Sequence, residues 1–169
     1  VDLVDYPDAD VVKGLRLEGL ADWLRDGVDG RLRRFRLPID DEQRVSGEVL
    51  YVGLELPRIT PRNRTRRHRW VYAQGSATAD GNHLVRVDTE TGETKTWSES
   101  GMFVEEPVPV GNPSENPGVV LVTALNVSEK RSDLLIFDQR SLQLRGRAAL
   151  PHHLPFGFHG RYFAGWPSA

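Results

Sequence analysis

Three ionisable residues recur along the chain at nearly equal intervals, and each lies in an apolar setting. Glu55 lies within an apolar run, Glu106 follows another, and His159 lies in the segment Phe156–Gly160. The intervals between them are 51 and 53 residues. A buried carboxylate or imidazole costs free energy unless it is paired or bound to a metal. Two carboxylates and an imidazole projecting toward one axis would meet that demand together.

The chemistry that such a group supports is metal binding. Imidazole is a ligand for iron, zinc, copper and nickel. A histidine ligand usually donates its other ring N–H to a carboxylate. We therefore consider His159 as a metal ligand, with Glu55 and Glu106 either orienting ligand histidines or ligating directly. One histidine cannot hold a catalytic metal, so the remaining ligands would have to come from residues that this chain lacks.

Each of the three residues also has a purely structural interpretation. His159 could be a core histidine with satisfied hydrogen bonds, and Glu55 and Glu106 could be rim residues of a sheet. Glu105 is expected to point away from Glu106, toward the surface, because successive side chains of a strand alternate.

The other four histidines are not predicted to be ligands. His152 and His153 are adjacent, so on a strand they would face opposite sides and could not both point toward the axis with His159. His68 and His83 lie in polar, loop-like segments and are expected to face solvent.

The composition excludes several other kinds of site. The chain has 169 residues, 22 Lys and Arg against 24 Asp and Glu, a net charge of -2 and no cysteine. Disulfides, thiolate zinc sites and cysteine nucleophiles are therefore excluded. The balanced charge gives no overall attraction to nucleic acid or anionic membranes. The arginine-rich segment Arg62–Arg69 is expected to be a solvated loop, because Trp70 is the only aromatic residue beside it.

The chain begins at Val1, and its only methionine is Met102. We therefore expect residue 1 not to be a translation start.

The elements that must position these residues are predicted to be mostly strands. One amphipathic helix is predicted from a cap at Asp10 through Leu24, since its apolar residues recur at helical spacing. Short apolar or alternating runs bounded by turn residues indicate strands elsewhere. The predicted strands are Val1–Tyr6, Arg31–Leu37, Glu48–Leu56, Arg69–Gln74, Leu84–Asp88, Glu93–Trp97, Phe103–Val110, Gly118–Val127, Asp133–Asp138, Leu142–Leu150 and Phe156–Phe163.

A repeat helps to choose among all-β architectures. Leu84–Asp88 matches Leu134–Asp138 at an offset of 50 residues, and each is followed by a turn and a more polar strand. A period of about 40–50 residues with four strands is typical of propeller blades. A β-sandwich remains the alternative. In a propeller, a group that recurs once per blade on the innermost strand would face the central axis.

An ordered series of segments also resembles a known family. These segments are Leu54–Ile59, Arg69–Tyr72, Glu106–Val108, Gly118–Leu121, Leu135–Asp138 and Leu150–Gly160, which reads LPHHLPFGFHG. Together they look like the C-terminal part of the carotenoid cleavage oxygenases, a family that includes the retinal pigment epithelial isomerohydrolase. The similarity runs from Val1 to Phe163. Thr60 replaces the family's usual Asn, and residues 114–118 depart from its acidic turn, but both lie outside the inferred metal shell.

The resemblance implies a seven-bladed β-propeller with Fe(II) on its axis, held by four histidines. His159 matches the last of these ligands, and Glu55 and Glu106 match two of the glutamates that support them. The resemblance further implies that residues 1–169 are a C-terminal fragment of one propeller domain, about three blades with a short helical insertion near the N-terminus. The other three ligands would lie upstream, so the isolated chain is expected to be inactive.

The function implied by the resemblance is oxidative cleavage of a conjugated C=C bond by O2. The substrate would be a carotenoid, an apocarotenoid or a stilbene-like molecule, and isomerohydrolase chemistry is a minor alternative. A non-catalytic propeller scaffold and a lactonase-type propeller hydrolase are the alternatives from other classes. No nucleic-acid partner is expected. We expect a cytoplasmic location, with any peripheral membrane contact made through the upstream part, and the oligomeric state stays open.

Overall fold

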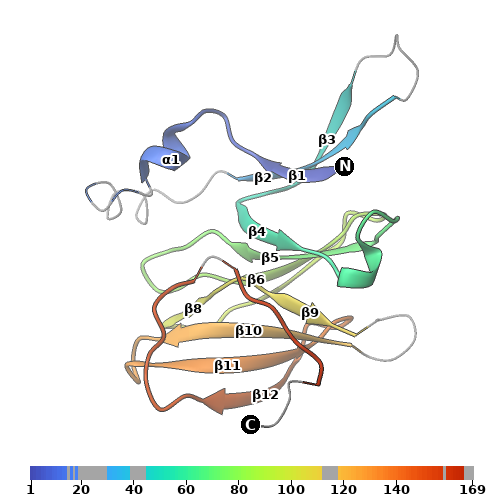
Figure 1. Cartoon of the computed structure of the whole chain (residues 1–169). Helices are drawn as coiled ribbons and strands as arrows, with labels where there is room; N and C mark the ends of the chain where they lie inside the picture. Colours follow the sequence, from blue (N-terminus) through green and yellow to red (C-terminus); the bar gives the residue numbers. More distant parts are fainter. Residues whose placement is uncertain are drawn as a thin grey trace.

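The computed structural model describes residues 1–14, 16, 18, 30–38, 45–111, 118–157 and 159–165. Those residues form three antiparallel sheets, which lie in succession along the molecule (Figure 1). The all-β prediction is therefore confirmed. The helix α1 (Asp10–Gly14) begins where predicted. The rest of the predicted helix falls largely on Leu15, Leu17 and residues 19–24, which lie outside the described residues.

The first sheet has the strand order β1-β2-β3. Its strands are β1 (Asp2–Asp5), β2 (Arg31–Arg36) and β3 (Ser46–Val52). The predicted strand Glu48–Leu56 is in fact two strands, because the chain leaves this sheet at Gly53. Gly53 has a φ of 82°, and a Cβ there would lie 2.7 Å from Ser76 Oγ, so only glycine fits this crossing without strain.

The second sheet follows in the order β4-β5-β6-β7. Its strands are β4 (Leu54–Arg58), β5 (Trp70–Gly75), β6 (Leu84–Asp88) and β7 (Thr94–Trp97). A short 3₁₀ helix, η1 (Pro61–Asn63), lies in the arginine-rich connection between β4 and β5.

The third sheet has the order β12-β11-β10-β8, and β9 also pairs with β10. Its strands are β8 (Met102–Val104), β9 (Val108–Val110), β10 (Val119–Asn126), β11 (Arg131–Asp138) and β12 (Leu144–Ala149). The two copies of the sequence repeat are β6 and β11, which occupy equivalent places next to the last strand of their sheets. Asp88 and Asp138 each accept two backbone N–H groups of the following turn, so the two copies share this contact.

Two apolar layers hold the three sheets together, and the middle sheet contributes to both. On β5, Val71 and Ala73 face the first sheet, whereas Tyr72 faces the third. On β6, Val85 and Leu84 divide in the same way. The alternation arises because successive side chains of a strand point to opposite faces. Stacking through both faces of the middle sheet is the arrangement of neighbouring propeller blades.

The first strands of the second and third sheets are irregular where the two predicted glutamates lie. The register between β4 and β5 shifts between Glu55 and Arg58. The predicted strand Phe103–Val110 is interrupted between β8 and β9, at residues 105–107. Pro57 and Pro107 explain both breaks, because proline has no N–H to donate to a ladder. Each glutamate therefore lies at a local break in strand pairing.

The closing segment differs from the prediction, since no strand occurs in residues 151–157 or 159–165. Its backbone N–H groups pair with side chains instead of a neighbouring strand. Leu154 N–H donates to Ser132 Oγ (2.8 Å) and Gly157 N–H to Glu105 Oε1 (3.1 Å). The segment thereby crosses the third sheet as an irregular strap (Figure 1). In the described part of the chain, no helix has the length and apolar character needed to cross a membrane.

Candidate metal centre

Glu55, Glu106 and His159 line one cleft of about 390 Å³, together with residues of β4 and the loop that follows it. They reach it from three different elements: β4, the break between β8 and β9, and the closing segment. The spacing argument therefore predicted correctly that residues 51 and 53 positions apart would come together. The other residues lining the cleft are Leu56, Pro57, Arg58, Ile59 and Arg64.

Glu106 is the most deeply buried member of the group, with a side chain only 4% exposed. Its carboxylate has three polar partners. Oε1 contacts Arg58 Nη1 at 2.9 Å and His159 Nδ1 at 3.1 Å, and Oε2 accepts the N–H of Gly160 at 2.8 Å. These contacts satisfy a buried carboxylate that would otherwise be strongly disfavoured.

His159, in contrast to Glu106, has a largely exposed side chain (75%). An ionised carboxylate only accepts hydrogen bonds, so Nδ1 is the protonated ring nitrogen and donates to Glu106. Nε2 makes no hydrogen bond with any residue that the structure describes. The imidazole is therefore oriented through Nδ1, and the lone pair of Nε2 has no partner among the described residues. Such an arrangement is what a histidine ligand to a metal requires.

Glu55 has a different environment. It is half-buried, and the hydroxyl of Tyr6 donates a hydrogen bond to Oε1. Burial raises the pKa of the Glu55 carboxyl, while hydrogen bonds from Tyr6 and the Leu56 N–H oppose that rise. The pKa of the Tyr6 hydroxyl is raised by burial and by the hydrogen bond to Glu55.

Glu105 is more exposed than Glu106, as expected, but its carboxylate is not free at the surface. Its side chain is half-buried, accepts a hydrogen bond from the Thr123 hydroxyl, and holds the Gly157 N–H of the closing segment. The two adjacent glutamates therefore both hold the strap, Glu105 at Gly157 and Glu106 at Gly160.

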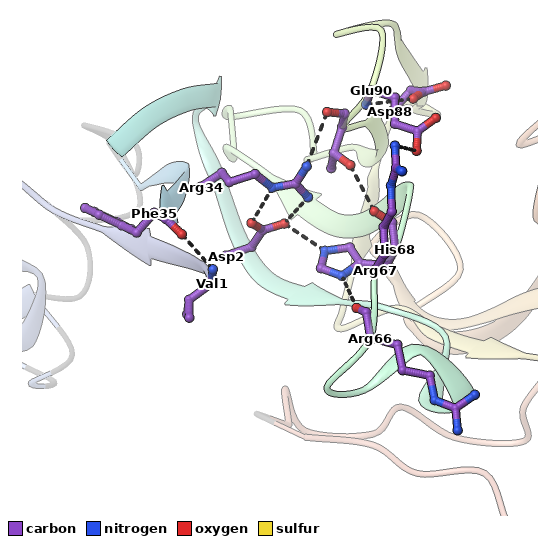
Figure 2. Close-up of polar contacts among 10 residues, drawn as sticks. Val1, Asp2, Arg34, Phe35, Arg66, Arg67, His68, Asp88 and Glu90 are labelled. Carbon is purple, nitrogen blue, oxygen red and sulfur yellow. Dashed lines mark hydrogen bonds and ion pairs between the residues drawn. The ribbon is translucent and has the colours of Figure 1, made fainter. Parts of the chain in front are cut away.

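Two of the remaining histidines also differ from the prediction. His68 is not solvent-facing: its Nε2 lies 2.7 Å from Asp2 Oδ2 and its side chain is only 15% exposed (Figure 2). His83 is half-buried, and burial lowers its pKa. His152 and His153 are exposed. The carboxylate partner of His68 is 66 residues away, so no local sequence pattern could have predicted it.

Sequence reasoning missed two partners of the glutamates: Arg58, which lines the cleft, and Tyr6, which donates to Glu55. Tyr6 is 49 residues from Glu55, and Arg58 is 48 residues from Glu106. For Arg58 a signal existed, because an arginine three residues after an apolar-strand glutamate could serve a second buried carboxylate. Among the described residues, no group of three or more histidines, aspartates or glutamates is arranged to hold a metal. Among those residues, the cleft is lined by one histidine, His159.

A profile of the retinal pigment epithelial membrane protein family matches residues 1–164, nearly the whole chain. The chain belongs to this family, the carotenoid cleavage oxygenases. A carotenoid isomerooxygenase of Galleria mellonella is 30% identical over 184 aligned residues, which cover 95% of the chain and 35% of that protein. A mitochondrial carotenoid-cleaving dioxygenase of Macaca fascicularis is 33% identical over 115 residues, covering 65% of the chain and 21% of that protein.

Solved structures of carotenoid cleavage oxygenases match the fold as well. An apocarotenoid oxygenase of Synechocystis superposes with a TM-score of 0.68 at 26% identity, over 78% of this chain and 30% of that one. A lignostilbene dioxygenase of Pseudomonas brassicacearum also gives 0.68 over 78% of this chain and 32% of that one, at 18% identity, which speaks for the fold alone. The predicted propeller fold class is confirmed. This carotenoid cleavage oxygenase chain spans about a fifth to a third of the length of the relatives it matches.

Proposed function

We propose that the complete protein is a nonhaem Fe(II) dioxygenase that cleaves a conjugated C=C bond with O2. The substrate would be a carotenoid, an apocarotenoid or a stilbene-like molecule, and the products would be carbonyl compounds. The observation that carries the proposal is the His159–Glu106 pair: an exposed imidazole held through Nδ1 by a buried carboxylate, beside a cleft.

The residues present fit such a metal. Neutral imidazole nitrogen is a suitable donor for iron, and His159 has its Nε2 unpaired within the described structure. A ligand set of neutral histidines leaves the charge of Fe(II) unbalanced, and the buried carboxylate of Glu106 is placed to offset it. When bound, the iron would supply coordination positions for O2 beside the alkene.

The chain's own residues would hold and orient the parts of such a site. Glu106 holds the imidazole of His159, and Glu55 lies on the same cleft, where it is available to a further ligand histidine from the rest of the protein. Leu56, Pro57 and Ile59 add an apolar wall. A polyene substrate has almost no polar groups, so an apolar wall beside the ligand suits it.

We further propose that residues 1–169 are one part of a single propeller domain, with the other ligands supplied by the remaining part. The short share of each relative that the chain covers supports this proposal. Alone, the chain would expose unpaired blade faces. On the outer strand β3, Val49 is 47% exposed and Val52 is 57% exposed. We expect the isolated chain to bind iron weakly, to aggregate and to lack turnover.

The proposal is tested on the complete protein loaded with Fe(II). An apocarotenoid, a full-length carotenoid and a stilbene are each incubated under ¹⁸O₂, and the products are analysed by mass spectrometry. Dioxygenase cleavage predicts two carbonyl products, each carrying the labelled oxygen when solvent exchange is corrected. Unchanged substrate in all three incubations, or label-free products formed equally well without O2, would overturn it.

A further inference from the structure

We propose that Arg58 is a positioning residue of this site, which fixes the Glu106 carboxylate so that His159 is presented to the metal. The inference rests on the proposed function and extends it to a residue that does not itself touch the metal. Arg58 contacts Glu106, which holds the imidazole, and the carbonyl of Gly160, the residue that follows His159. No other arginine of the described structure makes an ion pair with Glu106.

The geometry carries the proposal. From the end of β4, Arg58 Nη1 lies 2.9 Å from Glu106 Oε1, the same oxygen that receives Nδ1 of His159. Arg58 Nη2 donates to the carbonyl oxygen of Gly160 at 3.4 Å. Glu106 Oε2 in turn accepts the N–H of Gly160. The guanidinium, the carboxylate and the strap backbone therefore form a closed ring of contacts around the residue that follows His159.

The burial of these groups indicates a structural constraint rather than a casual surface contact. The side chain of Arg58 is 20% exposed and that of Glu106 is 4% exposed. An ion pair between exposed side chains would be weak and mobile, but this carboxylate has almost no access to water. Loss of Arg58 would leave Oε1 with His159 as its only partner among the described residues, and it would release the carbonyl of Gly160.

The planar fork of arginine explains why this position needs more than a positive charge. Two N–H groups of one guanidinium point to two acceptors on different elements, Glu106 and Gly160. The ammonium of lysine is a compact charge on a flexible stem and does not reproduce a fixed fork. Lysine at position 58 would keep the charge but lose part of the orientation.

Arg64 provides a matched control. It lines the same cleft and is exposed, yet it makes no ion pair with Glu106. Replacing it removes the same charge from the same cleft without touching the ring of contacts. A difference between Arg58 and Arg64 variants therefore reports the contacts of Arg58 and not the net charge of the cleft.

The test compares the complete protein with Arg58→Met, Arg58→Lys and Arg64→Met, using His159→Ala as the iron-free reference. Two quantities are measured: the rate of Fe(II) release to excess chelator, and the thermal midpoint of the metal-free protein. Residues that orient a metal ligand typically change metal affinity about 10–100-fold. Arg58→Met should speed release by about that factor, Arg58→Lys should recover part of it, and Arg64→Met should stay within about twofold of wild type.

The outcomes separate the two proposals. A wild-type protein that holds no iron would overturn the proposed function, and the Arg58 proposal with it. Wild-type release rates in Arg58→Met, or equal acceleration in Arg58→Met and Arg64→Met, would overturn the Arg58 proposal alone. An equal lowering of the metal-free midpoint in Arg58→Met and Arg58→Lys, without faster release in either, would also overturn it. If Arg58→Met does not fold, Arg58→Lys against Arg64→Met decides the same question.

Discussion

Two clusters in this chain contain the same three side-chain types, an arginine, a carboxylate and a histidine, but use them differently. In the first, Asp2 joins Arg34 and His68 (Figure 2). In the second, Glu106 joins Arg58 and His159. The histidine of the first cluster is 15% exposed and that of the second is 75% exposed.

The difference lies in how much of each imidazole the protein occupies. His68 has contacts at both ring nitrogens, since Nε2 faces Asp2 at 2.7 Å and Nδ1 lies 3.4 Å from the carbonyl of Arg66. Within the described part of the chain, His159 is held only at Nδ1. A histidine with both nitrogens in use serves to join elements, whereas one with a free Nε2 can bind a ligand. Exposure and the number of engaged ring nitrogens, not residue type, distinguish the structural histidine His68 from the proposed metal ligand His159.

The arginines differ in the same sense. Arg34 donates twice to Asp2, with Nε at 2.8 Å and Nη2 at 2.7 Å, so that β1 and β2 are joined within one sheet (Figure 2). Arg58 divides its two donors between a carboxylate and the strap backbone. The first cluster thus joins β1 to β2 and to the loop before β5, and the second joins two blades to the closing segment.

The largest expected effect is the difference in iron occupancy between replacing His159 and replacing His68. In the complete protein, His159→Ala should abolish iron occupancy and oxygenase turnover, because it would remove the proposed ligand. His68→Ala should leave iron occupancy unchanged. Metal analysis of both purified variants checks the pair. Full iron and full activity in His159→Ala would refute the ligand assignment.

A smaller effect is expected from replacing Glu106, the carboxylate that holds the proposed ligand. Glu106→Gln keeps the shape of the side chain but removes the charge that receives the Nδ1 proton and pairs with Arg58. We expect iron affinity to fall by about 10–100-fold, measured by competition with a chelator. The matched variant Asp2→Asn should leave iron affinity within about twofold of wild type, and an equal loss in both variants would remove the distinction between the clusters.

Asp2→Asn should instead weaken the pairing of β1 with β2. The Asp2 side chain is 9% exposed and accepts two hydrogen bonds from Arg34. Hydrogen bonds to charged groups contribute about 1.5–3 kcal/mol, so we expect a loss of about 2 kcal/mol in the local free energy of opening. Hydrogen exchange of the β1 and β2 amides in the complete protein measures it. Protection equal to that of the wild type would show that the Asp2–Arg34 interaction does not stabilise this strand pair.

The smallest expected effect is a pH dependence of the first cluster. Burial alone would raise the pKa of Asp2, but hydrogen bonds from Arg34 and His68 outweigh it and hold that pKa well below its ordinary value of 3.8. The unfolded chain therefore takes up this proton first, so the contribution of Asp2 is fully present above about pH 5 and is lost as the pH falls further. Exchange protection of β1 should drop below pH 4 in wild type. Asp2→Asn should flatten that drop, and an identical drop in both proteins would contradict the assignment.

Much of the fold could be predicted from the sequence because it depends on local patterns. Alternation, turn residues and the LVRVD/LLIFD repeat place most strands and make β6 and β11 equivalent. The breaks at Glu55 and Glu106 could have been predicted as well, since Pro57 and Pro107 cannot complete a ladder. The strand predicted at Phe156–Phe163 was wrong. Its apolar residues indicate a strand, but the N–H groups of Gly157 and Gly160 donate to the side chains of Glu105 and Glu106 instead of to a neighbouring strand.

By itself, the sequence determined the strand content, the blade period and the three residues that meet at the cleft, because spacing at a structural period brings side chains to one axis. Only the tertiary structure decided which partners they take. Tyr6 reaches Glu55 across 49 residues, Arg58 reaches Gly160 across 102, and His68 finds Asp2 across 66. Such contacts depend on how the sheets and the strap pack in space. Packing between segments distant in the chain produces no periodic pattern in the sequence.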